Sequence, residues 1–161
     1  MVEDMELDRA ETVVELGAGT GSFTKAIERN LRPEALFLAL EVNSEFAAGL
    51  QTTVSQAKVI NDSAENLGAL LRGFDRDYAD SIVCGLPWAS FPGVLQDRIM
   101  QAVVSALRPG GRFATFAYIH AAWFPTARRF HGWLQSHFPE VKKTRIEWKN
   151  LPPAFVYRCE K

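Results

Sequence analysis

The stretch with the clearest chemical meaning is a glycine-rich turn, Gly17-Ala18-Gly19-Thr20-Gly21. It follows apolar Val13 and Val14, which favour a buried strand, and it precedes a segment, 22–30, with apolar residues at helical spacing. A glycine lets a ligand lie directly against the backbone, and free N–H groups at a helix start favour a carboxylate or phosphate. The sequence therefore predicts a strand, turn and helix that bind a ligand.

Two carboxylates follow the turn at the ends of the next two predicted strands. Glu41 closes the apolar stretch 35–42, where an acidic side chain can accept hydrogen bonds from both ribose hydroxyls of an adenosine moiety. Asp62 follows the short strand 58–61, where a carboxylate can accept from an adenine amino group. Dinucleotide-binding enzymes use similar glycine turns but do not routinely require the second acid. Together the two acids indicate an adenosine-containing ligand.

Aromatic residues mark a second candidate site, in the loop 85–92 and after the predicted strand 112–119. Aromatic rings attract a cationic group by about 0.5–2 kcal/mol per contact. Tyr118 and His120 are candidates for accepting a proton, although His120 could equally be a loop histidine without a catalytic duty. We expect Trp88 to line this pocket rather than the core. The rings that could surround such a cation are Trp88, Phe91, Tyr118 and Trp123, of which Phe91 and Trp123 could equally belong to the core.

Strands and helices that alternate up to residue 138 must position these groups. This alternation predicts an α/β fold with a doubly wound, seven-stranded, mostly parallel sheet and helices on both faces, whose ligand lies at the carboxyl ends of the strands. The last two strands should pair antiparallel. The predicted strands are 12–16, 35–42, 58–61, 79–84, 112–119, 141–148 and 154–159, and the longer helices are 92–107 and 125–138.

Length and composition limit the number of domains, the cellular location and the kinds of partner that we expect. A chain of 161 residues buries roughly 70% of its unfolded surface, which supports one domain spanning 1–161. No apolar run approaches the ~20 residues of a membrane helix. The acidic start, 1–9, does not resemble a secretory signal, and Cys84 and Cys159 are too few for a disulfide framework, so we expect a cytoplasmic protein. Eighteen basic against nineteen acidic residues argue mildly against RNA as a partner, and we expect no metal.

As a set, the motifs Glu15 to Gly21, Glu41, Asn61-Asp62 and Arg108 to Gly111 resemble the class I S-adenosylmethionine-dependent methyltransferases, over nearly the whole chain. The resemblance implies a Rossmann-like fold and S-adenosylmethionine as cofactor, with S-adenosylhomocysteine as its product. Glu15 could touch this cofactor or brace the glycine turn, and Asp62 could instead cap a helix. The implied cofactor-binding residues are Glu15, Gly17, Ala18, Gly19, Glu41, Val42, Asp62, Ser63 and Gly85.

Two later stretches, 85–92 and 150–158, resemble the bacterial phospholipid N-methyltransferases that convert phosphatidylethanolamine towards phosphatidylcholine. This implies methyl transfer to the ethanolamine headgroup, with Trp88, Tyr118 and His120 around the acceptor. The first stretch is also similar to the Asn-Leu-Pro-Tyr element of ribosomal-RNA adenine dimethyltransferases. Because that family holds the adenine amino group with an Asn or Asp where this chain has Gly85, the RNA alternative ranks second. A small amine as substrate, and a cofactor-binding module without activity, stay open.

Members of the phospholipid N-methyltransferase family resemble one another in having a helical N-terminal segment, which is thought to lie on the membrane and cover the cofactor. Only a short segment precedes Thr12 here, so we expect this lid to be missing. The chain is then a trimmed form, or another chain closes the pocket, or the substrate is soluble. Peripheral contact with anionic headgroups could come from a set of basic residues that could equally be a solvated face: Arg128, Arg129, Lys142, Lys143 and Arg145.

Overall fold

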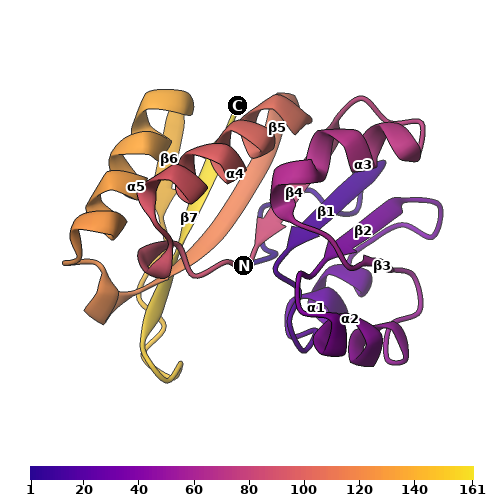
Figure 1. Cartoon of the computed structure of the whole chain (residues 1–161), viewed down its shortest axis with the longest axis horizontal. Coiled ribbons are helices and arrows are strands. Elements are labelled where there is room, and N and C mark those ends of the chain that lie inside the picture. Colours follow the sequence, from indigo (N-terminus) through magenta and orange to yellow (C-terminus); the bar gives the residue numbers. More distant parts are fainter.

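The computed structural model describes all residues from Met1 to Lys161, and one seven-stranded sheet runs through it in the order β3-β2-β1-β4-β5-β7-β6 (Figure 1). The first five strands are parallel, and β7 pairs antiparallel with both β5 and β6. The predicted doubly wound sheet with an antiparallel end is confirmed. The strands are β1 (Thr12–Leu16), β2 (Leu36–Leu40), β3 (Lys58–Ile60), β4 (Ala79–Cys84), β5 (Leu107–Tyr118), β6 (Glu140–Lys143) and β7 (Ala154–Glu160).

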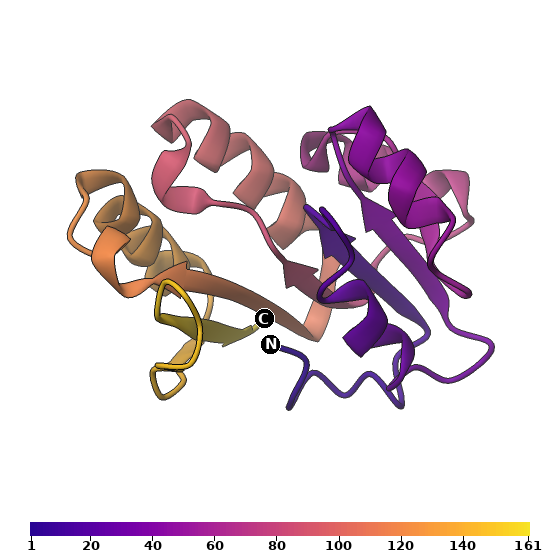
Figure 2. The ribbon, with the colours of Figure 1, turned by 90° about the horizontal axis from the view of Figure 1, so that it is seen from below.

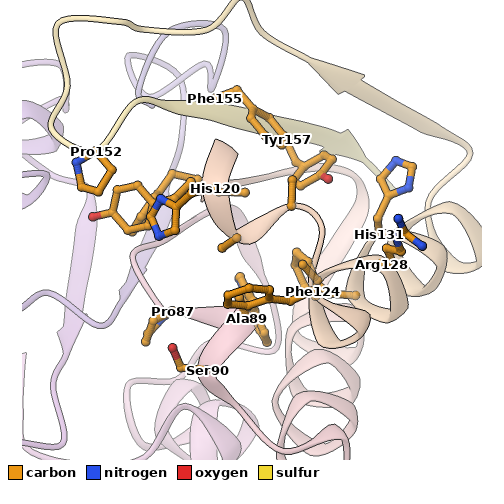
Figure 3. Close-up of a pocket in the computed structure, with 18 of the residues that line it drawn as sticks. Pro87, Ala89, Ser90, His120, Phe124, Arg128, His131, Pro152, Phe155 and Tyr157 are labelled. Atoms are coloured by element: carbon orange, nitrogen blue, oxygen red, sulfur yellow. The ribbon is translucent and has the colours of Figure 1, made fainter.

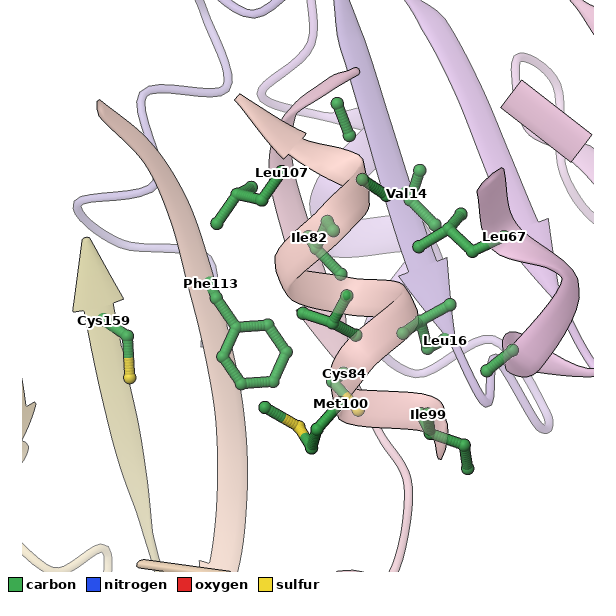
Figure 4. Close-up of a cluster of buried hydrophobic side chains, with 14 of the residues drawn as sticks. Val14, Leu16, Leu67, Ile82, Cys84, Ile99, Met100, Leu107, Phe113 and Cys159 are labelled. Atoms are coloured by element: carbon green, nitrogen blue, oxygen red, sulfur yellow. The ribbon is translucent and has the colours of Figure 1, made fainter. Parts of the chain in front are cut away.

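Helices cover both faces of the sheet. On one face α3, α4 and α5 pack onto a core that includes Val14, Ile82 and Phe113, and Figure 4 shows the side chains of Cys84, Met100 and Phe113 meeting there. On the other face α1, α2 and the N-terminal segment pack onto a second cluster, with Met5 and Phe37. Figure 2 shows the pink α4 above the sheet and the indigo N-terminal segment below it. The helices are α1 (Thr24–Glu28), α2 (Ser44–Gln51), α3 (Leu67–Gly73), α4 (Gly93–Ala106) and α5 (Pro125–His137), with short 3-10 turns η1 (Ala64–Asn66), η2 (Trp88–Ser90) and η3 (Ile119–Ala121).

Several element boundaries differ from those predicted. The helix expected over 22–30 covers only Thr24–Glu28, because the glycine turn extends further. The strand expected over 141–148 ends at Lys143, and beyond it only Thr144 and Glu147 still bond to β7 or its start. The segment 145–153 therefore leaves the sheet and projects beside the carboxyl end of β5, since Tyr118 pairs with Ala154.

Candidate active site

The glycine turn joins β1 to α1 in a backbone conformation that other residues rarely adopt. Gly17, Gly19 and Gly21 have φ values of +72°, +54° and +86°. A Cβ on Gly17 would lie 2.7 Å from a Leu86 methyl, and one on Gly21 would lie 2.5 Å from a Leu50 methyl, whereas no atom lies within 4 Å of that position on Gly19. A side chain at Gly17 or Gly21 would thus have to displace a leucine as well as adopt an unfavourable φ, whereas Gly19 faces open space.

Glu41 lies directly against this turn. Its Oε2 accepts a hydrogen bond from the Gly19 amide at 2.8 Å, and its Oε1 accepts one from the Asn43 amide at 2.9 Å. The side chain is buried, and each carboxylate oxygen keeps a second lone pair. Val42, the next residue, is exposed, and its carbonyl accepts from the Asn61 amide group at 3.0 Å. Glu41 can therefore bind a hydroxyl group while it holds the turn in place.

Glu15 is a fully buried carboxylate on β1, below the turn. Its Oε2 accepts from the Thr24 hydroxyl at 2.6 Å, so it braces the first residue of α1, while its Oε1 has no partner. Burial raises the pKa of Glu15 to about 7, against the lowering effect of the Thr24 hydrogen bonds and with a smaller raising effect from the charges of Glu41 and Glu28. This buried oxygen without a partner is a group that a hydrogen-bond donor or a cation would stabilise.

Asp62 and Ser63 lie after β3 at the same edge of the sheet. Asp62 Oδ1 accepts from the Ser63 amide at 2.6 Å and from the Asn66 side chain at 2.7 Å, and Ser63 Oγ accepts from the Glu65 amide at 3.3 Å. Both residues thus stabilise the start of η1, as the capping alternative predicted. Asp62 Oδ2 accepts no hydrogen bond within the chain, so this oxygen is available to a ligand as well.

Gly85 brings the end of β4 into contact with the turn. Its amide donates to the Leu16 carbonyl at 2.7 Å, and a Cβ at this position would lie 2.7 Å from the Gly17 carbonyl oxygen. A buried Ala18, whose amide donates to the Leu40 carbonyl at 3.1 Å, completes the contact between the turn and β2. No side chain fits at position 85, which gives a packing reason for the glycine that the sequence shows there.

A cavity of about 760 Å³ opens next to the glycine turn. Leu86, the residue that packs on Gly17, is part of its lining, so the turn and the cavity share a wall. Figure 3 shows side chains pointing into this space from the β4–α4 loop, from α5 and from β7. The lining is mostly apolar and contains no Asp or Glu. It is formed by 86–90, 116–118, 120–122, 124, 127–128, 130–131, 143–144, 146, 152, 155 and 157.

Trp88 lies in the core as well as in this lining, so the expectation that it stays outside the core is wrong. Its side chain is 4% exposed and stacks on Phe130 with ring centroids 4.4 Å apart. Its Nε1 donates to the Thr115 hydroxyl at 2.8 Å, and that hydroxyl donates to the Cys84 carbonyl. The indole can sit in the core because its only polar group is satisfied there.

Tyr118 and His120 line the cavity together, with their rings stacked at 5.6 Å between centroids. The other two rings considered for the pocket are not part of the lining: Phe91 packs edge-on against Trp88, and Trp123 is exposed. Of the four aromatic residues expected around an amine, the structure brings Trp88 and Tyr118 together with His120. Their contact with a substrate stays a prediction.

His131 is a lining residue that the sequence interpretation missed. It lies on α5 beside Tyr157, with ring centroids 5.3 Å apart, and both burial and the charge of Lys143 lower its pKa. A lowered pKa keeps its imidazole neutral near pH 7, the form that can accept a proton. Helical spacing could have indicated it, because Ala127 and His131 are four residues apart on a face adjacent to buried Phe130.

Two cations also reach the cavity without an acidic partner. Lys143 Nζ lies 5.3 Å from the Tyr157 ring centroid, and Arg128 lies 5.9 Å from the Trp123 ring, but neither forms an ion pair. By contrast, Arg129 pairs with Asp97 at 2.7 Å. The charged side chains of the cavity lining are therefore all cationic, which suits a ligand with an anionic group.

Two other kinds of site have no support in the structure. Cys84 is fully buried and burial raises its pKa to about 12, so it remains an unreactive thiol. No group of three or more His, Cys, Asp or Glu side chains is placed to hold a metal ion.

None of the helices is both long enough and apolar enough to cross a membrane.

Comparisons with known proteins place these features in a context. No family model matches the chain. The ornithine lipid N-methyltransferase of Singulisphaera acidiphila is 33% identical over 161 residues, which cover 98% of this chain and 80% of that protein. This similarity extends over both the glycine turn and the cavity-lining segments.

Solved structures share the architecture at low sequence identity. The N-methyltransferase NodS from Bradyrhizobium japonicum superposes with a TM-score of 0.76 at 14% identity, covering 98% of this chain and 90% of that one. An rRNA methylase from Streptococcus thermophilus gives 0.71 at 18% identity, with 97% and 89% covered. The Streptococcus mutans protein SMU.1697c, in complex with SAH, gives 0.68 at 15% identity, with 96% and 90% covered. These identities establish a common fold and leave the acceptor open.

Proposed function

Because this chain belongs to the class I S-adenosylmethionine-dependent methyltransferases, and resembles their lipid N-methyltransferases, we propose that it methylates the amine nitrogen of a lipid headgroup. The observation that carries the proposal is the cavity beside the glycine turn, whose volume lies within the range of about 300–1,000 Å³ typical of ligand pockets. Its mostly apolar lining suits a lipid better than a free polar amine. The relative from Singulisphaera, named for a lipid amine, supports the same class of acceptor.

The residues at the glycine turn fit the cofactor of this family, S-adenosylmethionine. Gly19 leaves open space where any side chain would project, and Glu15 Oε1 is buried without a partner beside it. We assign the ribose hydroxyls to Glu41, the adenine to Asp62, and the ammonium group of the methionine part to Glu15. The remaining assigned contacts are backbone or packing contacts from Gly17, Ala18, Gly19, Val42, Ser63 and Gly85.

When bound, this cofactor supplies an electrophilic methyl group on a sulfonium sulfur. The protein's own task is then to hold a neutral amine in line and to exclude water. Trp88 and Tyr118 form walls of the cavity for that purpose, and Trp88 belongs to the loop whose Leu86 packs on the glycine turn. Neutral His131, or alternatively His120 or Tyr118, accepts the ammonium proton from the incoming headgroup.

Arg128 and Lys143 narrow the choice of headgroup. Phosphatidylethanolamine pairs a primary amine with a phosphate, and an ornithine headgroup pairs one with a carboxylate. Both therefore offer an anion to the two unpaired cations of the cavity, whose lining contains no acidic side chain. We propose an amine lipid with an anionic group next to the amine as the acceptor, with phosphatidylethanolamine as one candidate.

Replacing both cations should weaken binding of the acceptor lipid and leave the rate of the methyl-transfer step itself unchanged. The double variant Arg128→Gln/Lys143→Gln is expected to raise the KM for such a lipid about ten-fold or more, since charge-assisted hydrogen bonds contribute about 1.5–3 kcal/mol and less where water screens them. The matched control is Lys142→Gln, which removes a neighbouring cation that is paired with Glu140 at 2.8 Å and lies outside the lining. Rates should be measured on lipid dispersed in detergent micelles. An unchanged KM in the double variant would exclude this mode of headgroup binding.

The ribosomal-RNA alternative ranks lower on the geometry of the turn. That activity relies on an Asn or Asp side chain where this chain has Gly85, and a Cβ there would collide with the Gly17 carbonyl oxygen. The rRNA methylase from Streptococcus thermophilus shares only the fold, at 18% identity. A lipid amine therefore remains the better-supported acceptor.

A further inference from the structure

Exposed apolar side chains concentrate around the cavity. Nine large apolar side chains of the chain are exposed, and five of them come from two short segments, 123–124 and 146–151. Trp123 is 73% exposed, Trp148 69% and Leu151 91%. A concentration of large exposed apolar side chains marks a surface that contacts a membrane or another protein. We call the residues 123–124 and 145–151 the cavity rim.

The two segments of the cavity rim are neighbours in space. Phe124 from the first and Ile146 from the second both line the cavity. The Ile119 amide, just before the first segment, donates to the Pro153 carbonyl, just after the second, at 3.0 Å. Figure 1 shows both segments at the lower end of the molecule, where β5 ends. A surface that binds the cavity rim is therefore next to the cavity.

The charge of the segment 119–153 favours contact with an anionic surface. Between residues 119 and 153 there are six basic and two acidic residues, although the whole chain carries a net charge of −1. Arg145 and Lys149 on the rim, like Arg128 and Lys143 in the cavity, form no ion pair. Exposed tryptophans interspersed with Lys and Arg are the composition of protein surfaces that enter the headgroup layer of a membrane.

We propose that the cavity rim docks this protein onto the headgroup layer of a membrane that contains anionic lipids, so that a lipid headgroup enters the cavity directly from the bilayer. The contact is peripheral: Trp123, Trp148 and Leu151 enter the interface, and Arg145 and Lys149 contact anionic headgroups. The biological meaning of this docking rests on the proposed lipid substrate. Membrane binding itself is measured without any methyl transfer.

Vesicle co-sedimentation tests the rim with matched variants. Trp123→Ala/Trp148→Ala is expected to lower the partition coefficient onto phosphatidylethanolamine/phosphatidylglycerol vesicles about ten-fold or more, because interfacial aromatic area is lost. Arg145→Gln/Lys149→Gln should lower it about five-fold per residue, which corresponds to about 1 kcal/mol for each basic residue near an anionic surface. On phosphatidylcholine vesicles this second variant should bind as the parent does.

The controls remove similar groups elsewhere. Tyr78→Ala removes an exposed aromatic residue just before β4, at the amino ends of the parallel strands and so at the end away from the cavity, and Lys25→Gln/Arg29→Gln removes two exposed, unpaired cations from α1 and its C-cap. Neither should change vesicle binding. If the rim variants bind vesicles as tightly as the parent, or if the controls reduce binding equally, the rim is not the docking surface.

The two proposals fail in different ways. Rim variants that lose vesicle binding but still methylate lipid in detergent micelles confirm both the docking surface and the substrate. Vesicle binding that depends on the rim, together with no methylated lipid in either vesicles or micelles, would leave the docking surface in place and overturn the lipid substrate.

Discussion

Trp88→Ala is expected to lower the free energy of unfolding by about 3–5 kcal/mol, the range for truncating a buried aromatic side chain. Trp88 is buried, stacks on Phe130 and donates to the Thr115 hydroxyl at 2.8 Å. Its removal leaves a cavity between η2 and α5 and takes away a hydrogen-bond donor. Urea denaturation of the parent and the variant measures the loss.

Trp123→Ala is the matched control for Trp88, because the same side chain is removed from an exposed site. It should change the free energy of unfolding by no more than about 0.5 kcal/mol. A loss below about 1 kcal/mol in Trp88→Ala would mean that Trp88 does not belong to the core in solution.

Glu15→Gln should make the protein more stable at alkaline pH, relative to the parent. Burial raises the pKa of Glu15 from 4.5 to about 7, so the folded protein holds this proton more tightly than the unfolded chain. The parent therefore loses stability as the pH rises from 4.5 to about 7 and loses no more above it. A pKa shift of this size corresponds to a loss of roughly 3 kcal/mol in the free energy of unfolding. A glutamine at this position stays neutral, so the variant does not show this loss.

The measurement compares the parent and Glu15→Gln by urea denaturation at about pH 5 and about pH 8, without cofactor. The stability difference between the two proteins should change by roughly 2.5 kcal/mol in favour of the variant at the higher pH, since part of the loss has already occurred at about pH 5. Glu45→Gln, an exposed carboxylate at the start of α2, serves as the control. Glu15→Gln should also bind S-adenosylhomocysteine more weakly than the parent does, because we assign Glu15 to the ammonium group of that ligand. No pH-dependent difference would show that Glu15 is not a strained, buried acid.

The elements around the glycine turn could be predicted from the sequence because their signals are local. Alternate glycines, an apolar strand before them and an acid at the end of β2 define the turn without reference to distant residues. Asn43, a residue type that favours the start of a helix, caps α2, since its side chain accepts from the Glu45 and Phe46 amides. Short-range patterns of this kind survive in the folded structure.

The acceptor cavity could be predicted only in part, because its walls depend on long-range contacts. A loop rich in Gly and Pro indicates exposure, yet Trp88 is buried by Phe130 on α5 and by Thr115 on β5. His131 and Tyr157 meet only because β7 returns antiparallel beside β5. The sequence pattern fixed neither their distance nor the absence of acidic residues in the lining.

The central claim is that the cavity accepts the amine of a lipid. One reaction tests it most directly: the protein is incubated with labelled S-adenosylmethionine and a mixture of detergent-dispersed phosphatidylethanolamine and ornithine lipid, ribosomal RNA and small soluble amines, and the label is counted after phase separation. We predict that the label appears in the lipid fraction, on the headgroup nitrogen. Label recovered in the RNA or the soluble amines, with none in the lipid, would contradict the account.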